Sequence, residues 1–234
     1  MQFSDLNLSR QLLNALDDLG LDTPTAIQAK AFAPIMSGVD VVGISQTGTG
    51  KTFAYLLPIL RMWKFTKEPY PQILIVVPTR ELVMQVVEAA KQLTEYMTVQ
   101  IVPAYGGTNI KTQKNALDAG VDIVVGTPGR LVDLMWHGQL STKRLRWVVI
   151  DEVDEMLNLG FRTQLKNMVD LLPEKRQQLM FSATMIPEVE SVISRFTEHY
   201  VKIEAAPSGA PLENITQFAY GVRNFNTKRN LLEF

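Results

Sequence analysis

The chain has 234 residues, of which 46% are hydrophobic, so it can bury the core of one substantial α/β domain plus a fragment. A formal net charge of −1 excludes a protein that binds nucleic acid through its overall charge, as a histone does, but permits a local basic groove. Cysteine is absent, which excludes disulfides and thiolate metal sites. No apolar run approaches the roughly 20 residues of a membrane span, and the first residues lack the pattern of a signal peptide. We therefore expect a cytoplasmic protein with no membrane contact.

Segments with strand and helix patterns alternate along the chain. The apolar run 39–44 predicts a first strand, and apolar residues spaced by three and four predict a helix over 53–63. Further strands are expected over 73–77, 99–104, 123–125, 147–150, 179–181 and 200–203, and further helices over 81–96, 112–119, 131–136, 164–171 and 188–196. This alternation is typical of an α/β fold with a mostly parallel sheet and helices on both faces.

The composition changes near residue 205. The segment from Ala205 to Pro211 is rich in Ala, Pro and Gly and is typical of a linker. A strand over 215–222 and a helix beginning near Thr227 are expected after it. We therefore divide the chain into a domain over 1–204, a linker over 205–212 and the truncated start of a second domain over 213–234.

A phosphate-binding loop is predicted between the first strand and the helix that follows it. Its residues are Ser45, Gln46, Thr47, Gly48, Thr49, Gly50, Lys51 and Thr52. Glycines let backbone N–H groups surround a phosphate, and the helix directs the positive end of its dipole at the same anion. Lys51 would reach the outer phosphates and Thr52 would bind Mg²⁺. Ser45 stands where such loops open with Gly or Ala, and a simple Gly/Ser turn is the alternative.

An acidic motif, Asp151-Glu152-Val153-Asp154, follows the apolar run 145–150. Alone, such a pair of acids is as consistent with a solvated turn or a helix cap. Because ligands of open parallel sheets gather at the carboxyl ends of the strands, this motif and the phosphate loop should face one crevice. Together they predict a site for a nucleoside triphosphate and magnesium.

Four further clusters follow predicted strands and carry hydroxyl, glycine amide or guanidinium groups. They are Pro78-Thr79-Arg80, Gly106-Gly107, Thr127-Pro128-Gly129-Arg130 and Ser182-Ala183-Thr184. Each alone is explained by a helix cap or a turn. In combination they would place donors for phosphate oxygens along one edge of the sheet, well beyond the nucleotide.

Taken together, these motifs resemble the first RecA-like domain of a DEAD-box RNA helicase, in identity, order and approximate spacing, over Phe3 to Phe234. The segment from Gly20 to Gln28 is similar to the Q motif of this family, and Phe3 stands 17 residues before Gly20, as the isolated aromatic of the family does. The resemblance implies a RecA-like P-loop NTPase fold. It also implies an adenine site formed by Phe3, Leu21, Thr23 and Gln28, although Phe3 is also explained as a hydrophobic staple of its own helix.

The resemblance implies a role for each matching residue. ATP would be held by the phosphate loop, residues 45–52, and Mg²⁺ by Thr52 and, through water, Asp151. Glu152 would position or deprotonate the attacking water, and Asp154, Ser182 and Thr184 would couple hydrolysis to domain closure, with Lys51 and Asp151 completing the catalytic group. The RNA backbone would be bound by Pro78, Thr79, Arg80, Gly106, Gly107, Thr127, Pro128, Gly129 and Arg130.

The implied activity is ATP-dependent RNA binding and local duplex unwinding, largely indifferent to RNA sequence. A second RecA-like domain would supply arginine fingers, so this chain alone is expected to bind nucleotide but to turn over ATP poorly. Val153 replaces the usual Ala of the family, Ser45 the usual Ala, and Leu21 a frequent aromatic. None of these three differences removes a catalytic group.

Two alternatives stay open: an ATP-gated RNA clamp in which hydrolysis is incidental, and a P-loop enzyme that acts on DNA. The hydrolytic acid Glu152 argues against the first, and Gln28 with its neighbours argues against the second. Lys64, Lys67, Arg144 and Arg146 would extend a basic rim, or simply form a solvated face.

Overall fold

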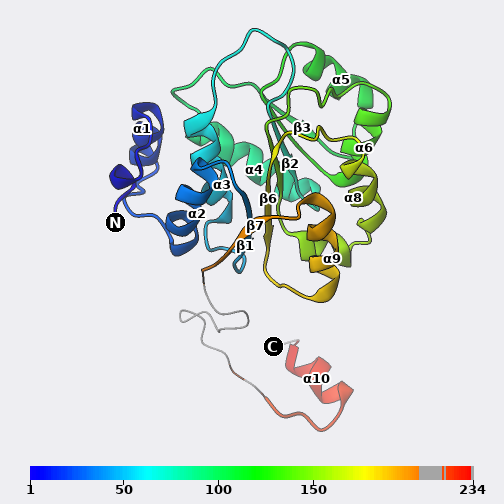
Figure 1. Cartoon of the computed structure of the whole chain (residues 1–234). Helices are drawn as coiled ribbons and strands as arrows, with labels where there is room; N and C mark the ends of the chain where they lie inside the picture. The colour runs from blue at the N-terminus through cyan, green and yellow to red at the C-terminus, as the bar shows by residue number, and fades with distance from the viewer. Residues whose placement is uncertain (206–217, 219, 233–234) are drawn as a thin grey trace.

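The computed structural model describes residues 1–205, 218 and 220–232. Its centre is a seven-stranded sheet in the order β3-β4-β2-β5-β6-β1-β7, and every neighbouring pair is parallel (Figure 1). The strands are β1 Asp40–Ile44, β2 Ile73–Val76, β3 Ile101–Ala104, β4 Ile123–Gly126, β5 Trp147–Ile150, β6 Gln177–Ser182 and β7 Tyr200–Glu204.

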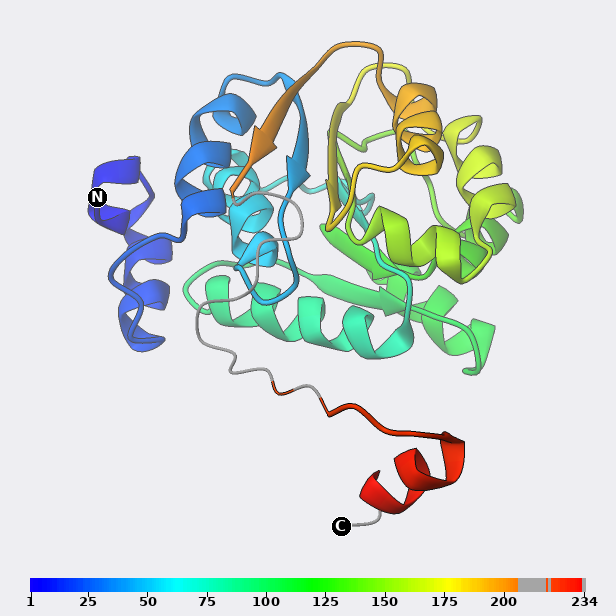
Figure 2. The same ribbon diagram turned by 90° about the horizontal axis from the view of Figure 1, so that it is seen from below.

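Helices cover both faces of the sheet (Figures 1 and 2). One core contains the 3-10 helix η1 and the first four α-helices: η1 Phe3–Leu6, α1 Arg10–Asp18, α2 Ala26–Met36, α3 Lys51–Met62 and α4 Arg80–Leu93. The other core contains the next five: α5 Ile110–Asp118, α6 Pro128–Trp136, α7 Val153–Asn158, α8 Arg162–Val169 and α9 Pro187–Phe196. The α/β fold class predicted from the sequence is confirmed. Within the described residues, no helix is both long and apolar enough to cross a membrane.

Alternate side chains of the strands pack into the two cores. In β2, Ile73 and Ile75 pack with α1 to α4, whereas Leu74 and Val76 pack with the helices of the opposite face. Side chains of a strand point to alternate faces, so a strand that is covered on both sides must be apolar throughout. This explains the continuous apolar runs that predict the strands.

The boundary of β6 differs from the sequence prediction where polar residues are buried. Strand β6 begins at Gln177, two residues before the predicted start. The side-chain amide of Gln177 donates to the carbonyl oxygens of Ile35 (2.9 Å) and Val39 (2.7 Å), and that of Gln178 donates to Val148 (3.1 Å). Buried amides with satisfied hydrogen bonds extend the strand although their type suggests a loop.

Three α-helices, α1, α2 and α7, have no counterpart among the predicted elements. Helix α1 had a usable signal, since Ser9 caps it by accepting from Leu12 N at 3.4 Å. Helix α7 is only six residues long, too short for periodicity to reveal. The predicted helices otherwise correspond to observed ones, with ends shifted by up to three residues.

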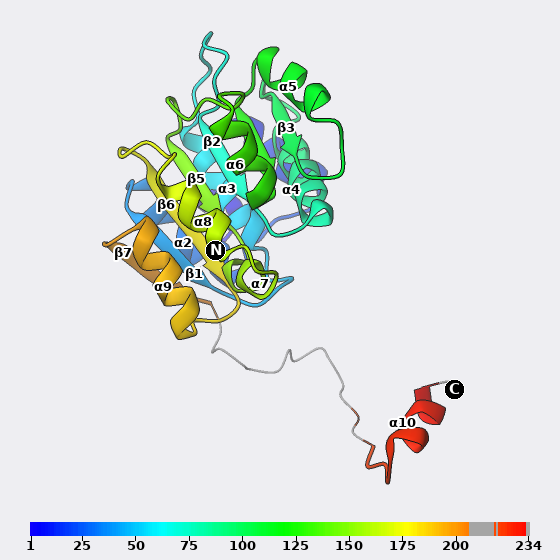
Figure 3. The ribbon, with the colours of Figure 1, turned by 90° about the vertical axis from the view of Figure 1, so that its right-hand side faces the viewer.

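The predicted linker lies, apart from Ala205, outside the described residues, as do positions 215–217 and 219 of the predicted strand. The described residues of that strand, Phe218 and 220–222, are not in strand conformation. The helix expected near Thr227 is present as α10 Phe225–Leu232, which stands apart from the sheet and its helices (Figure 3). The division into a domain, a linker and a second domain stays a prediction.

Candidate functional site

The sheet order gathers every predicted motif at one edge. Because all strands are parallel, the loops that follow them share the carboxyl edge. The loops after β5, β6 and β1 are neighbours and carry the acidic motif, Ser182-Ala183-Thr184 and the phosphate loop, and we call them the nucleotide half. The loops after β3, β4 and β2 are also neighbours and carry the predicted RNA-binding residues, and we call them the RNA half. The two predicted functions thus fall on two contiguous halves of one edge.

The phosphate loop has the backbone that its glycines permit. Gly48 and Gly50 have φ values of 78° and 89°, in the left-handed region that L side chains rarely adopt. A Cβ atom on Gly50 would also overlap the Gln28 side chain. Gly50 precedes the first residue of α3, so the free amides of that helix face the loop.

Ser45 has a structural role at the start of this loop. Its backbone N–H donates to the Ser182 carbonyl at 3.0 Å, which joins the ends of β1 and β6. Its buried hydroxyl contacts the Thr49 hydroxyl, which in turn donates to the Gln46 carbonyl at 2.7 Å. The serine therefore fits where Gly or Ala is usual.

Lys51 is the cation at the centre of the nucleotide half. Its side chain is only 6% exposed, and its Nζ has no hydrogen-bond partner within the described part of the chain. Ser182 Oγ is likewise buried and without a partner there. A buried ammonium without a partner is costly, so the loop is complementary to an anion, as a phosphate group is.

The acids face this lysine. Burial raises the pKa of Asp151 to about 6, although Lys51 acts in the opposite direction. Burial also raises the pKa of Glu152, whose backbone lies in the left-handed region at φ 56° and ψ 52°. Such a backbone costs on the order of 1–3 kcal/mol in a non-glycine residue and is typical of functional sites. Val153 is completely buried in the core of the second face, which accommodates it in place of Ala.

Asp154 connects the acidic motif to the loop after β6. Its Oδ2 accepts from the backbone N–H groups of Ala183 and Thr184, both at 3.1 Å, and from the Thr184 hydroxyl at 3.2 Å. One carboxylate oxygen thus fixes the neighbouring loop. Hydrogen bonds to a charged acceptor are roughly twice as strong as neutral ones.

Magnesium would depend on few protein ligands. Within the ranges that the structure describes, no three His, Asp or Glu side chains form a cluster that could hold a metal ion. Thr52 and Asp151 are the predicted ligands, and a Mg²⁺ ion there would take its other ligands from phosphate oxygens and water, as is usual for this metal.

In the RNA half, some predicted residues act in the fold itself. Thr79 caps α4 by accepting from Leu82 N at 3.2 Å, which is the ordinary explanation of this residue. Pro78 and Pro128 are buried, so their side chains are closed to a ligand. The exposed groups of this half are Arg80, Gly106 and Gly107, while Thr127, Gly129 and Arg130 are partly exposed.

A polar network positions the two arginines of the RNA half. The Arg80 guanidinium lies 4.9 Å from the centre of the Tyr105 ring. Arg130 donates to Gln113 Oε1 at 2.8 Å and to the Thr108 carbonyl at 3.2 Å, and Gln113 donates to Thr108 Oγ1 at 2.7 Å. Tyr105, Thr108 and Gln113 were not predicted, because nothing in their spacing separates them from an ordinary loop and helix.

The residues predicted to form the adenine site differ in burial and in hydrogen bonding. Gln28 is buried and uses both ends of its amide: Oε1 accepts from Thr25 N at 2.8 Å, and Nε2 donates to the Gly50 carbonyl at 3.1 Å. The Phe3 ring is 3% exposed and packs in the core that contains η1 and α1 to α4, and Phe3 also lines a pocket of about 330 Å³ with Leu21. Thr23 is exposed.

Residues 25–192 match the family described as DEAD/DEAH box helicase. The chain belongs to this family. This DEAD-box chain is 39% identical over 216 residues to "ATP-dependent RNA helicase DeaD" of Mycobacterium tuberculosis (strain H37Rv), covering 92% of this chain and 38% of that protein. It is 37% identical over 230 residues to "Eukaryotic initiation factor 4A" of Caenorhabditis elegans, covering 98% of this chain and 57% of that protein.

A solved structure agrees with the fold of this DEAD-box chain. The crystal structure of a DEAD box protein from the hyperthermophile Methanococcus jannaschii matches it with a TM-score of 0.84 and 34% identity, covering 88% of this chain and 56% of that one. This match confirms the RecA-like fold expected from the resemblance. The chain spans 38% to 57% of the length of these three proteins.

Proposed function

We propose that this chain is the ATP-binding domain of a DEAD-box RNA helicase, and that in the longer protein it supports ATP-dependent RNA binding and local duplex remodelling. The observation that carries the proposal is the buried, unpaired Lys51 ammonium beneath a glycine-shaped loop, facing Asp151 and Glu152. This arrangement suits the phosphates of a nucleotide.

The residues of the nucleotide half divide the chemistry among them. Amides of Gly48 to Gly50 and the Lys51 ammonium would bind the phosphates. Magnesium held by Thr52 and, through water, Asp151 would neutralise charge on the outer phosphates. Glu152 would orient the attacking water or accept its proton, and its raised pKa makes it a stronger base than an ordinary glutamate.

The link from Asp154 to Ala183 and Thr184 is the proposed route from nucleotide state to domain closure. A change at the outer phosphates that moves Glu152 also moves the neighbouring Asp154, and with it the loop after β6. RNA would bind in the RNA half through its sugar-phosphate backbone, with little dependence on sequence.

We propose that this chain alone turns over ATP slowly. The loops of the nucleotide half, residues 45–50, 151–152 and 183–186, contain no arginine, and Arg80 and Arg130 are engaged in the RNA half. An arginine that stabilises the transition state is worth roughly a thousandfold or more in phosphoryl transfer. A second RecA-like domain is the proposed source of this arginine.

Calorimetric titration with magnesium ADP and magnesium GDP tests the binding part. Selective binding of ADP supports the adenine site, whereas equal affinity for both nucleotides would contradict it.

For the hydrolytic part, Glu152→Gln in the full-length protein should leave ATP and RNA binding intact while turnover collapses. The matched control is Glu155→Gln, an exposed acid of the same helix. Unchanged turnover in Glu152→Gln would remove Glu152 from its proposed role.

A further inference from the structure

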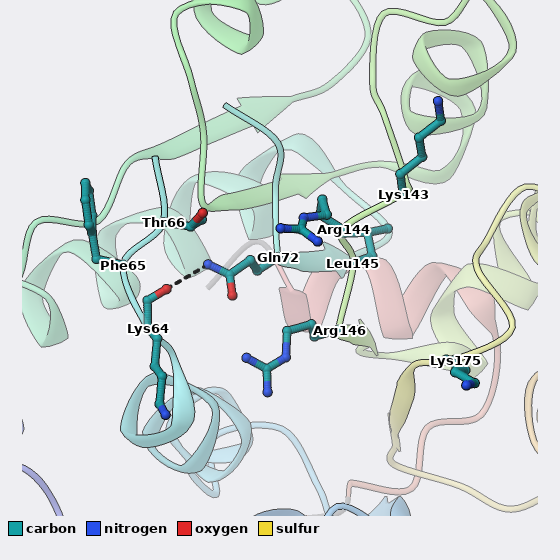
Figure 4. Close-up of a pocket in the computed structure, with 9 residues that line it drawn as sticks. All are labelled: Lys64, Phe65, Thr66, Gln72, Lys143, Arg144, Leu145, Arg146 and Lys175. Atoms are coloured by element: carbon teal, nitrogen blue, oxygen red, sulfur yellow. Dashed lines mark hydrogen bonds between the residues drawn. The ribbon is translucent and has the colours of Figure 1, made fainter. Parts of the chain in front are cut away.

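A basic pocket lies at the opposite edge of the sheet, where β2, β5 and β6 begin. Its volume is about 430 Å³, and it is lined by five cationic side chains and one aromatic ring: Lys64, Lys143, Arg144, Arg146, Lys175 and Phe65 (Figure 4). The side chains come from the segments just before these strands and just after α3. Strands of four to six residues separate this pocket from the carboxyl edge, which is roughly 13–20 Å of sheet. We call this feature the basic pocket.

The positive charge of the basic pocket is poorly compensated by the protein. None of the residues that line it is acidic, although the chain as a whole carries a net charge of −1. Arg144 pairs with Glu68, while the ammonium groups of Lys64, Lys143 and Lys175 have no ion-pair partner in the described ranges. Like charges that gather in a concave site attract an anion into it.

The wall of the basic pocket is held in place by backbone and ring contacts. Gln72 is only 6% exposed and donates from Nε2 to the Lys64 carbonyl at 2.9 Å (Figure 4). The backbone carbonyl of Gln72 accepts from Arg146 N at 2.8 Å. The Arg146 guanidinium lies 4.4 Å from the centre of the Trp147 ring. The cations therefore project from a fixed frame, which lowers the entropic cost of binding.

An aromatic surface continues from the basic pocket. Phe65 is 66% exposed and also lines a neighbouring pocket of about 560 Å³ together with Trp63 and Tyr96. Cationic and aromatic surfaces thus meet at one exposed ring. Proteins that bind single-stranded nucleic acid combine these two features, a positive groove for the phosphates and aromatic rings on which bases stack.

We propose that the basic pocket and Phe65 form an auxiliary site for single-stranded RNA, with phosphates among the cations and a base stacked on Phe65. This goes beyond the function proposed above, because it places RNA at the edge remote from the nucleotide. An acidic peptide would satisfy the charges but would leave the exposed ring unused. The choice of RNA over DNA rests on the proposed function.

The test is fluorescence anisotropy with a labelled oligouridylate of about 20 nucleotides, long enough for more than one contact. The triple variant Lys64→Ala, Lys143→Ala, Lys175→Ala keeps the contacts of Arg144, Arg146 and Gln72. Each lost phosphate contact reduces the magnitude of the negative slope of log K against log salt by about 0.7, so three lost contacts should reduce that magnitude by about 2 and lower affinity at low salt about tenfold or more. The control triple Lys114→Ala, Lys166→Ala, Lys202→Ala removes the same charge elsewhere and should bind as the native chain does.

Phe65→Ala tests the stacking part. The exposed ring contributes little to the core, so the variant should fold normally while RNA affinity falls about tenfold. Phe65→Tyr keeps an aromatic face and should restore binding. Equal affinity of Phe65→Ala and the native chain would overturn the stacking assignment and with it the proposal.

The remaining outcomes are also decisive. Equal losses in both triple variants, or a native chain that binds polyglutamate as tightly as RNA, would overturn the proposal in favour of general charge or an acidic partner. ADP affinity, measured on the same preparations, should be unchanged because no substitution lies at the carboxyl edge. RNA binding that depends on the basic pocket but survives Arg80→Ala would support this proposal while contradicting the proposed RNA half.

Discussion

The side-chain amide of Gln28 is hydrogen-bonded within the protein at both ends. Its amide closes the capping box of α2 through Thr25 and holds the phosphate loop through the Gly50 carbonyl. A side chain with both ends engaged can read adenine only if it exchanges one of these hydrogen bonds, or if the ligand uses a remaining lone pair or proton of the same amide. The proposed adenine recognition and the shape of the phosphate loop would therefore be linked in one residue.

We predict that Gln28→Ala and Gln28→Glu separate these two contributions. Alanine removes the cap and the loop contact, so the free energy of unfolding should fall by about 1–2 kcal/mol. Glutamate keeps an oxygen for Thr25 N but faces the Gly50 carbonyl with like partial charge, so the loss of stability should be smaller. ADP binding should be lost in both variants. Denaturant unfolding and calorimetry measure the two effects, and an unchanged stability of Gln28→Ala would contradict the structural role.

The ionised side chain of Glu152 lowers the stability of the folded chain. Burial raises its pKa, and nearby Asp154 and Glu155 add to this effect, although Lys51 opposes it. A raised carboxyl pKa means that the ionised form is less favourable in the folded than in the unfolded chain. At neutral pH the charge on Glu152 therefore destabilises the protein.

The expected consequence is that Glu152→Gln raises the melting temperature of the nucleotide-free chain at pH 7, while Glu155→Gln, which removes only the smallest contribution to this effect, raises it less. Differential scanning calorimetry without magnesium measures both. A melting temperature of Glu152→Gln at or below that of the native chain would mean that this glutamate is not under electrostatic strain. Functional sites commonly show such a trade between stability and activity.

At the scale of elements, the loop after β6 depends on a partner from another strand. The backbone N–H groups of Ala183 and Thr184 donate to the carboxylate of Asp154, which lies in the first turn of α7 after β5. Their order therefore depends on the pairing of neighbouring strands and on one carboxylate.

Asp154→Ala should free this loop locally. We expect the amides of Ala183 and Thr184 to exchange with solvent at least tenfold faster, and the free energy of unfolding to fall by about 1–3 kcal/mol, because two backbone donors lose their acceptor. Nuclear magnetic resonance of amide exchange tests this prediction. Exchange at the native rate would contradict the proposed coupling between the two loops.

The elements that sequence reasoning identified are those with a strong periodic or apolar pattern, such as β2 and β5, whose bounds agree to within one residue. Those it missed depend on information from elsewhere in the chain. The start of β6 depends on acceptors at Ile35, Val39 and Val148, which a local pattern cannot reveal. Short helices such as α7 carry too few residues for a period to appear.

For the site, the sequence was sufficient to locate the motif residues, but it did not reveal their burial or their hydrogen-bond partners. The phosphate loop and the acids follow from residue type, spacing and the position after a strand. That Phe3 is buried in the core, or that Arg130 is already paired with Gln113, depends on tertiary packing. Sequence patterns indicate which chemistry is available, whereas packing decides which groups are free to use it.

At the scale of the whole molecule, the sheet order separates the residues predicted for two functions along one edge. The strands are connected so that the phosphate loop, the acidic motif and the loop after β6 become neighbours, although they are far apart in sequence. The RNA half lies beside them, and Asp154 joins two loops within the nucleotide half. Each ligand is therefore expected to act mainly on its own half of this edge.

Hydrogen–deuterium exchange of the native chain, with magnesium ADP and separately with single-stranded RNA, tests this claim most directly. ADP should protect residues 45–52 and the loops after β5 and β6, and RNA should protect the loops after β2, β3 and β4. Protection by ADP in the RNA half with none at residues 45–52 would contradict the account.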